Sequence, residues 1–543
     1  MSRGYLALVL HAHLPFVKHQ KEGELAEEWL YEAITESYIP LLIVLNRLIQ
    51  KGVDYQLTIS LSPTLITMLA DPLLQLRYKK HLEKLIELSE KEIDRTKNEP
   101  QFHHLAKMYN DLFNKTYDYY HIKYKNNLLK AFKELEETGK IELITTCATH
   151  GYLPLMLTGE AINAQIKMGI DTYRRVFNKR PKGLWLPECA FKPAVEPYLA
   201  QNNIRYFICS SHGLLFAKPR PRYGLYAPIF TPSGIAAFGR DTESSRQVWS
   251  AAEGYPGDYD YREYYRDIGW DLDYEYIKDY LPSGVRKNTG LKYYRITGKG
   301  NWKEPYNPEA ARRKAAEHAG NFMFNRQQQV KYLSQVMDRK PIVVSPYDAE
   351  LFGHWWFEGP MWLEFLLEKI HFDQDDIETT TLSSYLEKEK KKQFAMPCEA
   401  SWGYRGYHEV WLNGSNDWIY RHLHEAEERL IKLASKYKHL ANKNSLIYRA
   451  LNQMCRELLL AQSSDWAFII NARTMVDYAV FRTKKHLDNF SLLAEGIMKN
   501  QLEERKIAEL EKINDIFPDL DFKIYQRNTG VKLGKEIESG NAL

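Results

Sequence analysis

Cysteine is scarce in this sequence, and the spacing of the cysteines does not match a disulfide framework or a zinc site. The 543 residues include five cysteines, an odd number without any CxxC pair: Cys147, Cys189, Cys209, Cys398 and Cys455. This usage argues against a disulfide scaffold and against a zinc ribbon. It fits a reducing compartment, so we expect a cytoplasmic protein.

Long hydrophobic runs are missing as well. The apolar stretch near the amino terminus, Tyr5 to Leu10, is too short for a signal-peptide core or a membrane span, and histidines interrupt it. We therefore interpret it as a strand and expect no membrane partner. Internal repeats and low-complexity segments are also absent.

A strong excess of either sign of charge is also missing. The sequence has 74 basic and 70 acidic residues, a formal net charge of +4, and the two signs alternate along stretches such as His81 to Lys97. Nothing in this pattern indicates a nucleic-acid partner. With 44% hydrophobic and 27% charged residues the chain is an ordinary globular protein, and its length favours a barrel domain with appended units.

Aromatic residues are abundant. They make up 13% of the chain, with 37 Tyr and 12 Trp. Most of them belong in the core, but aromatic faces also stack on the apolar faces of sugar rings. The composition is therefore compatible with a carbohydrate ligand.

Short apolar, β-branched runs recur along the first 350 residues, and helical segments such as Leu25 to Lys51 and Ala161 to Phe177 lie between several of them. Continuous hydrophobicity is typical of strands buried on both faces, so parallel βα units and a (β/α) barrel are predicted. The seven predicted strands are Tyr5 to Leu10, Asp54 to Ser60, Ile141 to Cys147, Gly183 to Leu186, Ile204 to Cys209, Gly234 to Phe238 and Pro341 to Val344.

Polar residues follow these strands directly. In a parallel barrel the carboxyl ends of the strands form the active-site face, so these distant segments are expected to deliver their side chains to one cleft. The residues are His11, His13, Ser60, Ser62, His150, Glu188, Ser211, His212, Arg240, Asp241, Asp348 and Glu350.

The remaining segments predict the domain organisation. Residues 1–400 are expected to form the catalytic barrel, with a charged amphipathic helical insertion at 74–138 and a Tyr-rich cleft wall at Tyr255 to Tyr280. Three- and four-residue apolar spacing predicts a helical domain over 401–527. Residues 528–543 lack such spacing and are expected to be a mobile tail.

Glu188 and Asp348 are the main catalytic candidates. Each follows a buried strand and a proline, and each alone is equally compatible with a structural acid or a helix cap. Together they match a glycosidic cleavage, in which one carboxylate attacks the anomeric carbon and the other protonates the leaving oxygen. Spacing does not show which of the two is the nucleophile and which is the acid. Four aromatic neighbours, Phe352, Trp355, Trp356 and Phe357, favour Asp348 as the acid, because loss of hydration raises a carboxyl pKa.

Several histidines are placed to meet a ligand. His11 and His13 alternate along one strand and so face the same side, which suits either a metal pair or two donors to sugar hydroxyls. A catalytic zinc usually needs three protein ligands, and spacing shows no third. His150, His212 and His354 are further strand-end donors, each equally compatible with a structural role.

The segment Ser401 to Tyr420 holds Trp402, Trp411 and Trp418 in a stretch that is neither good helix nor good strand. Such a loop favours a sugar-stacking surface over a core. Asp465 opens a later helical segment and is either its cap or an acceptor for sugar hydroxyls.

At this point the sequence resembles glycoside hydrolase family 57, and within it the 1,4-alpha-glucan branching enzymes. The resemblance spans most of the chain, through HAHLPF (11–16), THGYLP (149–154), WLPECAF (185–191), SPYDAELFGHWWFEGP (345–360) and SWGYRGYHEVWLNGSNDW (401–418). It implies an incomplete (β/α)7 barrel, a helical insertion and a C-terminal all-α domain, which agrees with the layout above.

The resemblance also implies roles for individual residues. Glu188 is then the nucleophile and Asp348 the general acid/base, while Trp402, Trp411 and Asp465 contact the glucan. An arginine in YREYYRDIGWD joins them, either Arg262 or Arg266, with Arg262 preferred. No metal or other cofactor is implied, and Cys189 beside the nucleophile resembles the branching-enzyme group.

One departure from the family pattern affects the expected reaction. Efficient branching enzymes of the family are expected to carry a catalytic-loop tyrosine, whereas the corresponding stretch, Thr231 to Ser250, contains none. Branching of an α-1,4-glucan such as amylose, glycogen or starch remains the first prediction, and an α-amylase or 4-α-glucanotransferase is the nearest alternative. A zinc-dependent deacetylase or mannosidase-like hydrolase built on His11 and His13 is more distant, and a non-catalytic glucan-binding protein is the last. The oligomeric state is not predicted.

Overall fold

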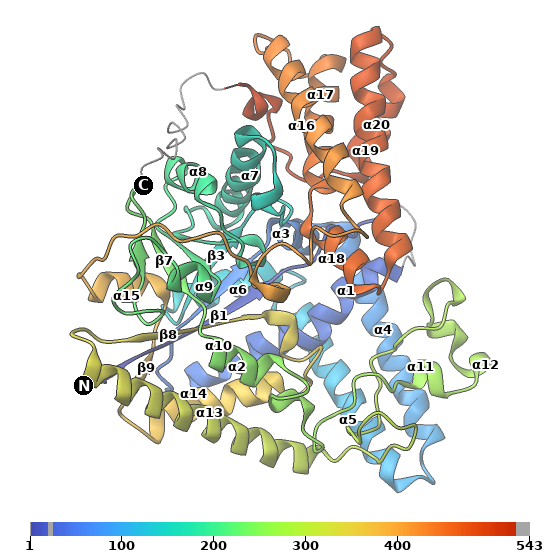
Figure 1. The fold of residues 1–543 in the computed structure, drawn as a ribbon. Coiled ribbons are helices and arrows are strands. Elements are labelled where there is room, and N and C mark those ends of the chain that lie inside the picture. Colours follow the sequence, from blue (N-terminus) through green and yellow to red (C-terminus); the bar gives the residue numbers. More distant parts are fainter. Residues whose placement is uncertain (1, 20–24, 528–543) are drawn as a thin grey trace.

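A parallel β-sheet lies at the centre of the molecule (Figure 1). In the computed structural model, which describes residues 2–19 and 25–527, the strands follow the order β6-β7-β5-β4-β3-β2-β1-β8. Every pair is parallel except β6 with β7, and a short ninth strand, β9, pairs with the start of β1. The bounds are β1 Gly4–Ala12, β2 Leu57–Leu61, β3 Ile141–Thr146, β4 Gly183–Trp185, β5 Tyr206–Cys209, β6 Ile229–Phe230, β7 Ala236–Gly239, β8 Ile342–Asp348 and β9 Ile377–Thr379.

The predicted fold class is confirmed. Each of the seven predicted strands is present, and β6 and β8 are the two ends of the sheet, so the barrel is incomplete. A hydrogen bond from the Asp241 N–H to the Val344 carbonyl (2.8 Å) bridges the gap between the β7 end and β8. The apolar run predicted from Asp54 is a strand only from Leu57, because the Gln56 N–H donates to the Thr379 hydroxyl instead of entering the ladder.

Helices cover the outside of this sheet, and polar residues cap several of them. Ser62, Thr158 and Asn307 accept hydrogen bonds from the first backbone N–H groups of α3, α7 and α13. The helix predicted over Leu25 to Lys51 is interrupted by a π-helical turn, Ala33–Tyr38. The covering helices are α1 Leu25–Glu32, α2 Ile39–Gln50, α3 Pro63–Ala70, α7 Gly159–Phe177, α8 Glu196–Gln201, α9 Ser211–Leu215, α10 Thr242–Trp249, α13 Pro308–Val336, α14 Gly359–Phe372 and α15 Leu382–Lys388.

The range predicted as a helical insertion contains three helices, two of which form the insertion while the third lies against the sheet. Helices α4 (Pro72–Arg95) and α5 (Pro100–Tyr117) pack against each other, whereas α6 (Leu128–Glu137) packs against β3 and belongs to the barrel layer. The range 74–138 therefore contains the insertion and one barrel helix. The Tyr-rich segment with the short helices α11 (Ile268–Asp271) and α12 (Tyr274–Ile277) lies against this insertion: the Tyr280 hydroxyl donates to Glu87 at 2.9 Å.

The last part of the described chain is helical and extends from one side of the barrel (Figure 1). Its helices are α16 Trp418–Lys436, α17 Leu446–Ala461, α18 Ser464–Ala472, α19 Val476–Lys499 and α20 Glu504–Ile513. The predicted helix Thr483 to Ile513 is divided at Asn500, which adopts a left-handed backbone. The predicted tail, 528–543, lies outside the described residues. None of the helices that can be described has the length and apolar character needed to cross a bilayer.

Candidate active site

Two carboxylates lie at the carboxyl-terminal edge of the sheet. Glu188 follows β4 by three residues, and Asp348 is the last residue of β8. In the strand register Asp348 lies opposite His11 of β1, and His11 lies opposite Ser60 of β2. These residues therefore lie side by side at the carboxyl-terminal edge of the sheet, which the sequence predicted as the active-site face.

The backbone at Glu188 is in an uncommon conformation. Glu188 has φ 59° and Cys189 has φ 48°, and His150, which follows β3, has φ 58°. Residues other than glycine rarely adopt this left-handed region. Where they do, the surrounding contacts must maintain the conformation, and such residues cluster at functional sites. Here the contacts include a hydrogen bond from the Trp402 N–H to the Glu188 carbonyl at 3.0 Å.

Each carboxylate oxygen of Glu188 accepts one hydrogen bond from a side chain. The Trp402 indole N–H donates to Oε2 at 2.8 Å, and the Ser464 hydroxyl donates to Oε1 at 2.8 Å. These donors come from the loop before α16 and from the first residue of α18. The C-terminal helical part therefore completes the surroundings of a carboxylate that the barrel provides.

Both carboxyl groups have elevated pKa values. Burial raises the pKa of Glu188 to about 7, against which the Trp402 and Ser464 hydrogen bonds act. Burial also raises the pKa of Asp348 to about 7, and the negative charge of Glu350 adds to this effect. The charge of Asp348 itself contributes to the elevated pKa of Glu188. Two carboxyl groups that influence each other and have pKa values near 7 suit acid/base and nucleophilic chemistry.

Four rings stack beside Glu188. His11 is 1% exposed and lies flat on Trp185, with ring centroids 4.3 Å apart and planes within 5°. His13 and His150 stack at 4.0 Å, and His11 and His150 at 5.0 Å. Burial lowers the pKa of His11 and His150 well below the usual range, so both are neutral.

His13 differs from the other two histidines because it has an acidic partner. Its Nε2 lies 3.0 Å from Asp465 Oδ2, across 452 residues of sequence. Burial alone would lower the His13 pKa, but the Asp465 charge and hydrogen bond outweigh it and raise the pKa. In return His13 overcomes the effect of burial on Asp465 and lowers the pKa of that carboxyl to about 2. His13 and Asp465 are therefore an ion pair at the mouth of the barrel.

The same residues supply the third potential metal ligand that sequence spacing did not reveal. Ligand atoms of His13, His150 and Asp465 lie within 4.8 Å of one another. However, the rings of His13 and His150 are nearly parallel, with 20° between their planes, and imidazole lone pairs lie in the ring plane. Both nitrogens of His150 also face other polar atoms, His11 Nε2 at 3.0 Å and Ser464 Oγ at 2.9 Å. The arrangement fits a hydrogen-bonded cluster rather than a tetrahedral zinc centre.

The other predicted ligand contacts are distributed differently. Arg262 is buried between the insertion and the segment after β8, where its guanidinium lies 4.1 Å over Phe357 and donates to the Tyr109 hydroxyl at 3.3 Å. His354 joins the same region through Glu36, 2.7 Å from its Nδ1. Arg266 instead pairs with Asp271 at 3.0 Å. Arg262 and His354 thus share a second polar cluster, and no described contact joins them to Glu188 or Asp348.

Trp411 requires a correction. Its side chain is 1% exposed and stacks on Tyr152 at 4.5 Å, beneath Gly403. A ring enclosed in this way cannot present a face to a sugar, so the predicted stacking role does not fit its position. Sequence alone could not separate it from Trp402, because both lie in one irregular loop. Of the four aromatic residues after Asp348, Phe352 and Trp356 pack with Trp362 in the core, whereas Trp355 is 53% exposed beside Tyr264.

Two residues of the site were not predicted. Ser464 contacts Glu188 and His150, and the Tyr38 hydroxyl donates to Glu350. Ser464 precedes the predicted Asp465, but nothing in its spacing links it to a glutamate 276 residues away. Glu350 was predicted at this edge from its place after the strand, and it also accepts a hydrogen bond from the His13 N–H at 3.1 Å.

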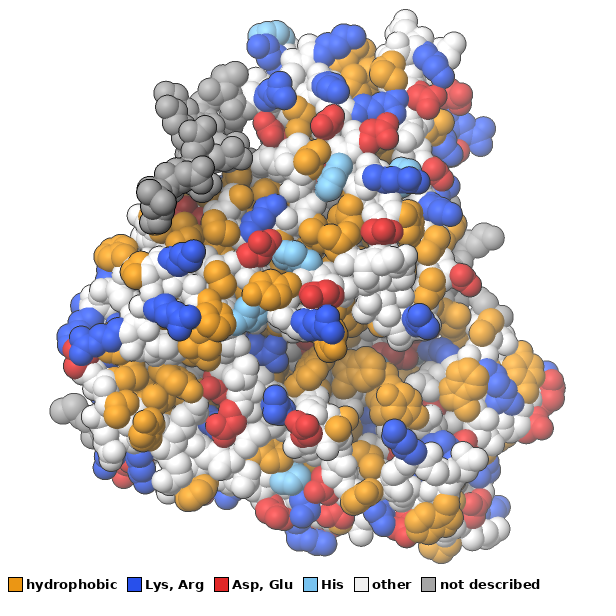
Figure 2. Space-filling model, in the orientation of Figure 1, with side chains coloured by type: hydrophobic (Ala, Val, Ile, Leu, Met, Phe, Trp, Pro, Cys, Tyr) orange, Lys and Arg blue, Asp and Glu red, His pale blue; other side chains and the backbone are white. Residues whose placement is uncertain are grey.

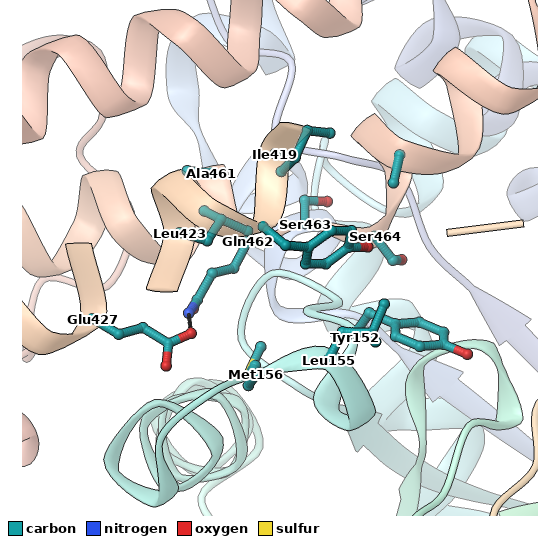
Figure 3. Close-up of a pocket in the computed structure, with 12 residues that line it drawn as sticks. Tyr152, Leu155, Met156, Ile419, Leu423, Glu427, Ala461, Gln462, Ser463 and Ser464 are labelled. Atoms are coloured by element: carbon teal, nitrogen blue, oxygen red, sulfur yellow. Dashed lines mark hydrogen bonds between the residues drawn. The ribbon is translucent and has the colours of Figure 1, made fainter. Parts of the chain in front are cut away.

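Figure 2 shows hydrophobic side chains gathered across the lower middle and right of the face drawn. Exposed aromatic residues that follow the barrel strands or belong to the Tyr-rich segment include Trp249, Tyr265, Trp270 and Trp355. Figure 3 shows Ser463 and Ser464 in the wall of a cavity of about 20 Å³, near Tyr152 and the hydrogen-bonded pair Glu427 and Gln462. This volume takes a water molecule and not a sugar.

An open parallel barrel with two such carboxylates at its mouth, surrounded by histidine and tryptophan side chains, defines a glycosidase-type enzyme. The chain belongs to glycosyl hydrolase family 57, whose sequence profile matches residues 7–398. A second profile, described as the C-terminal region of 1,4-alpha-glucan branching enzyme, matches residues 422–525.

Similar proteins agree over nearly the whole length. The chain is 33% identical to the 1,4-alpha-glucan branching enzyme TK1436 of Thermococcus kodakarensis, over 95% of this chain and 77% of that protein. The crystal structure of a GH57-type branching enzyme from Pyrococcus horikoshii has a TM-score of 0.87 at 34% identity, covering 98% of each chain. The alpha-amylase AmyC from Thermotoga maritima has a TM-score of 0.91 at 46% identity, covering 97% of this chain and 99% of that one.

Proposed function

We propose that this protein is a 1,4-alpha-glucan branching enzyme that works by a retaining double displacement. The observation that carries the mechanism is the pair of partly buried carboxyl groups, Glu188 and Asp348, each with a pKa raised to about 7 at the mouth of the barrel. The branching-enzyme profile over residues 422–525 and relatives of that name support the reaction.

In the first step Glu188 attacks the anomeric carbon of an α-1,4-glucan, and Asp348 gives its proton to the leaving oxygen. The nucleophile must be ionised and the acid protonated, and two carboxyl groups that titrate near neutrality meet both needs in one environment. The Trp402 and Ser464 hydrogen bonds stabilise the ionised form of Glu188, which favours it as the nucleophile. No side-chain hydrogen bond to Asp348 is described, and the Glu350 charge raises the Asp348 pKa beyond the effect of burial, which favours Asp348 as the acid.

In the second step Asp348 takes the proton from the 6-hydroxyl of an acceptor glucan, whose oxygen attacks the glucosyl–Glu188 ester. The ester bond breaks, an α-1,6 bond forms, and two inversions give net retention. Water as the acceptor would give hydrolysis through the same intermediate. Glu188 and Asp348 therefore account for cleavage in either case, and the cleft decides between the acceptors.

A hydrolase is the second candidate, and two observations favour it. The 46% identical structure from Thermotoga maritima is that of an alpha-amylase, and residues 231–250 contain no tyrosine. The zinc-dependent deacetylase or mannosidase alternative has less support, because the family profile covers residues 7–398 and both nitrogens of His150 have hydrogen-bond partners.

The test is a time course of the purified protein with amylose, in which iodine staining, reducing ends and chain lengths after isoamylase debranching are measured together. A branching enzyme lowers staining at nearly constant reducing ends, and isoamylase then releases new short chains. If reducing ends rise in step with the loss of staining and isoamylase releases nothing, the protein is a hydrolase. The Glu188→Gln variant is the blank for both activities.

The proposed substrate is therefore an α-1,4-glucan of the amylose, glycogen or starch type, and the proposed role lies in glycogen-type carbohydrate metabolism. We also propose a cytoplasmic location, which the five unpaired cysteines support.

A further inference from the structure

A continuous chain of hydrogen bonds runs from Glu188 into the barrel. Ser464 Oγ lies 2.8 Å from Glu188 Oε1 and 2.9 Å from His150 Nδ1. His150 Nε2 lies 3.0 Å from His11 Nε2, and His11 Nδ1 lies 3.0 Å from Ser60 Oγ. The four residues come from β1, β2, the segment after β3, and α18, and each is less than 4% exposed.

The ionised state of Glu188 and the neutral state of the two histidines fix the direction of every bond. An ionised Glu188 only accepts, so the Ser464 hydroxyl donates to it and accepts from His150 Nδ1–H. A neutral imidazole carries one N–H, so His150 Nε2 is an acceptor and His11 Nε2 must carry the proton that lies between them. His11 Nδ1 is then an acceptor, and the Ser60 hydroxyl donates to it.

The neighbouring charges explain why the two histidines are neutral. His13 stacks on His150, and the Asp465 charge favours the protonated form of His13. A second imidazolium in contact with it would be repelled, and both His11 and His150 are also cut off from water. His13 and Asp465 therefore act on the chain without being part of it.

We propose that Ser464 is a positioning residue for the nucleophile, and that Ser60, His11 and His150 fix the direction in which its hydroxyl donates. This inference rests on the proposed function only in taking Glu188 as the nucleophile. With Ser464 on Oε1 and Trp402 on Oε2, the carboxylate is held at both oxygens. No proton moves along the chain, because Ser464 donates to the carboxylate and to the glucosyl ester alike.

The directions can be observed by neutron diffraction on crystals exchanged into deuterium oxide. The chain requires deuterium on His150 Nδ1 and on His11 Nε2, with His150 Nε2 and His11 Nδ1 bare. Deuterium on His150 Nε2, or on both nitrogens of either ring, overturns the inference. This measurement needs no variant, so it does not depend on the folding of an altered protein.

The role of the Ser464 hydroxyl is tested with Ser464→Ala and Ser464→Thr, assayed on amylose and on an α-maltooligosyl fluoride. Fluoride leaves without acid assistance, so its release reports attack by Glu188 alone. In Ser464→Ala we expect kcat to fall about 10- to 100-fold on both substrates with KM nearly unchanged, because the charged carboxylate loses one of its two side-chain donors. Ser464→Thr retains a hydroxyl and is expected to remain within a few-fold of the parent.

A matched control is Ser445→Ala, which removes the N-cap of α17 in the same helical part of the chain. It is expected to lower Tm while leaving kcat unchanged, which separates general destabilisation from positioning. A Ser464→Ala variant with parental kcat, or with a loss confined to KM, contradicts the proposal. Equal losses in a folded Ser464→Thr variant contradict it too, because the hydroxyl would then not be the feature that matters.

Both assays count cleaved donor bonds, whichever acceptor follows, so a protein that proves to be a hydrolase leaves this inference standing. Full activity in Glu188→Gln would instead reject the proposed mechanism. The neutron result would even then report the direction of the hydrogen-bond chain by itself.

Discussion

Trp402 holds Glu188 at two points, through its indole N–H to Oε2 at 2.8 Å and through its backbone N–H to the Glu188 carbonyl at 3.0 Å. The first bond orients the carboxylate and the second maintains the left-handed backbone at the same residue. Trp402 was predicted from sequence as a sugar-stacking residue. Its contacts give it a direct influence on the carboxylate as well.

The Trp402→Phe variant removes the indole N–H and keeps an aromatic ring. We expect kcat to fall about 10- to 100-fold, because a charged acceptor loses one of its two side-chain donors. The pKa of Glu188 should rise, so the acid limb of the kcat/KM profile should move to higher pH. Trp29→Phe, in a half-buried tryptophan of α1 without a described indole hydrogen bond, is the control; a kcat loss of the same size there would remove the argument for Trp402.

The two carboxylates should respond differently to the leaving group. Glu188→Gln is expected to lose activity on amylose and on an α-maltooligosyl fluoride. Asp348→Asn should lose at least about 10³-fold on amylose but form the glucosyl-enzyme from the fluoride at a measurable rate, because fluoride needs no protonation. Mass spectrometry of the intact protein should then show the trapped adduct. An adduct in Glu188→Gln, with none in Asp348→Asn, would reverse the assignment.

Glu350 should set the alkaline limit of activity. Burial and the Glu350 charge raise the Asp348 pKa, so Glu350→Gln, which removes that charge, should lower it. The acid is active only when protonated, and the alkaline limb of the kcat/KM profile should therefore move to lower pH. Glu358→Gln provides a control, since Glu358 is also buried but contacts Tyr306 and the Arg262 N–H. An unchanged alkaline limb in Glu350→Gln would show that burial alone sets the Asp348 pKa.

Trp411 and Trp355 should separate stability from substrate binding. Trp411→Ala leaves a cavity under the 401–417 loop and is expected to cost about 3–5 kcal/mol in the free energy of unfolding. Trp355→Ala removes a half-exposed ring and should change stability by less than about 0.5 kcal/mol while raising KM for amylose. Denaturant unfolding and amylose kinetics on both variants check this. A stable Trp411→Ala protein with a raised KM would restore the predicted stacking role.

Much of the barrel was predictable because buried parallel strands are apolar on both faces and polar residues follow them. The three-residue strand β9, IET, has no such signature and was not predicted. The positions of Glu188 and Asp348 at the sheet edge follow from strand ends alone, but spacing could not order their roles.

The C-terminal contribution to the site was harder to predict. The contact of His13 with Asp465 spans 452 residues and that of Glu188 with Ser464 spans 276, and both depend on how α18 docks on the barrel. The docking is local, through the Ser464 N–H to the His150 carbonyl at 3.1 Å and a bridge between Gly151 and Ser463. The sequence predicts that Asp465 opens a helical segment but not the surface that this segment meets. For the same reason it could not distinguish the enclosed Trp411 from the half-buried Trp402.

The position of Ser464 and Asp465 late in the chain has a consequence for biosynthesis. A ribosome that has made the first 400 residues has already produced both carboxylates, but neither the donor to Glu188 nor the partner of His13. The nascent barrel therefore lacks the groups that hold its nucleophile until α18 has been translated and has docked.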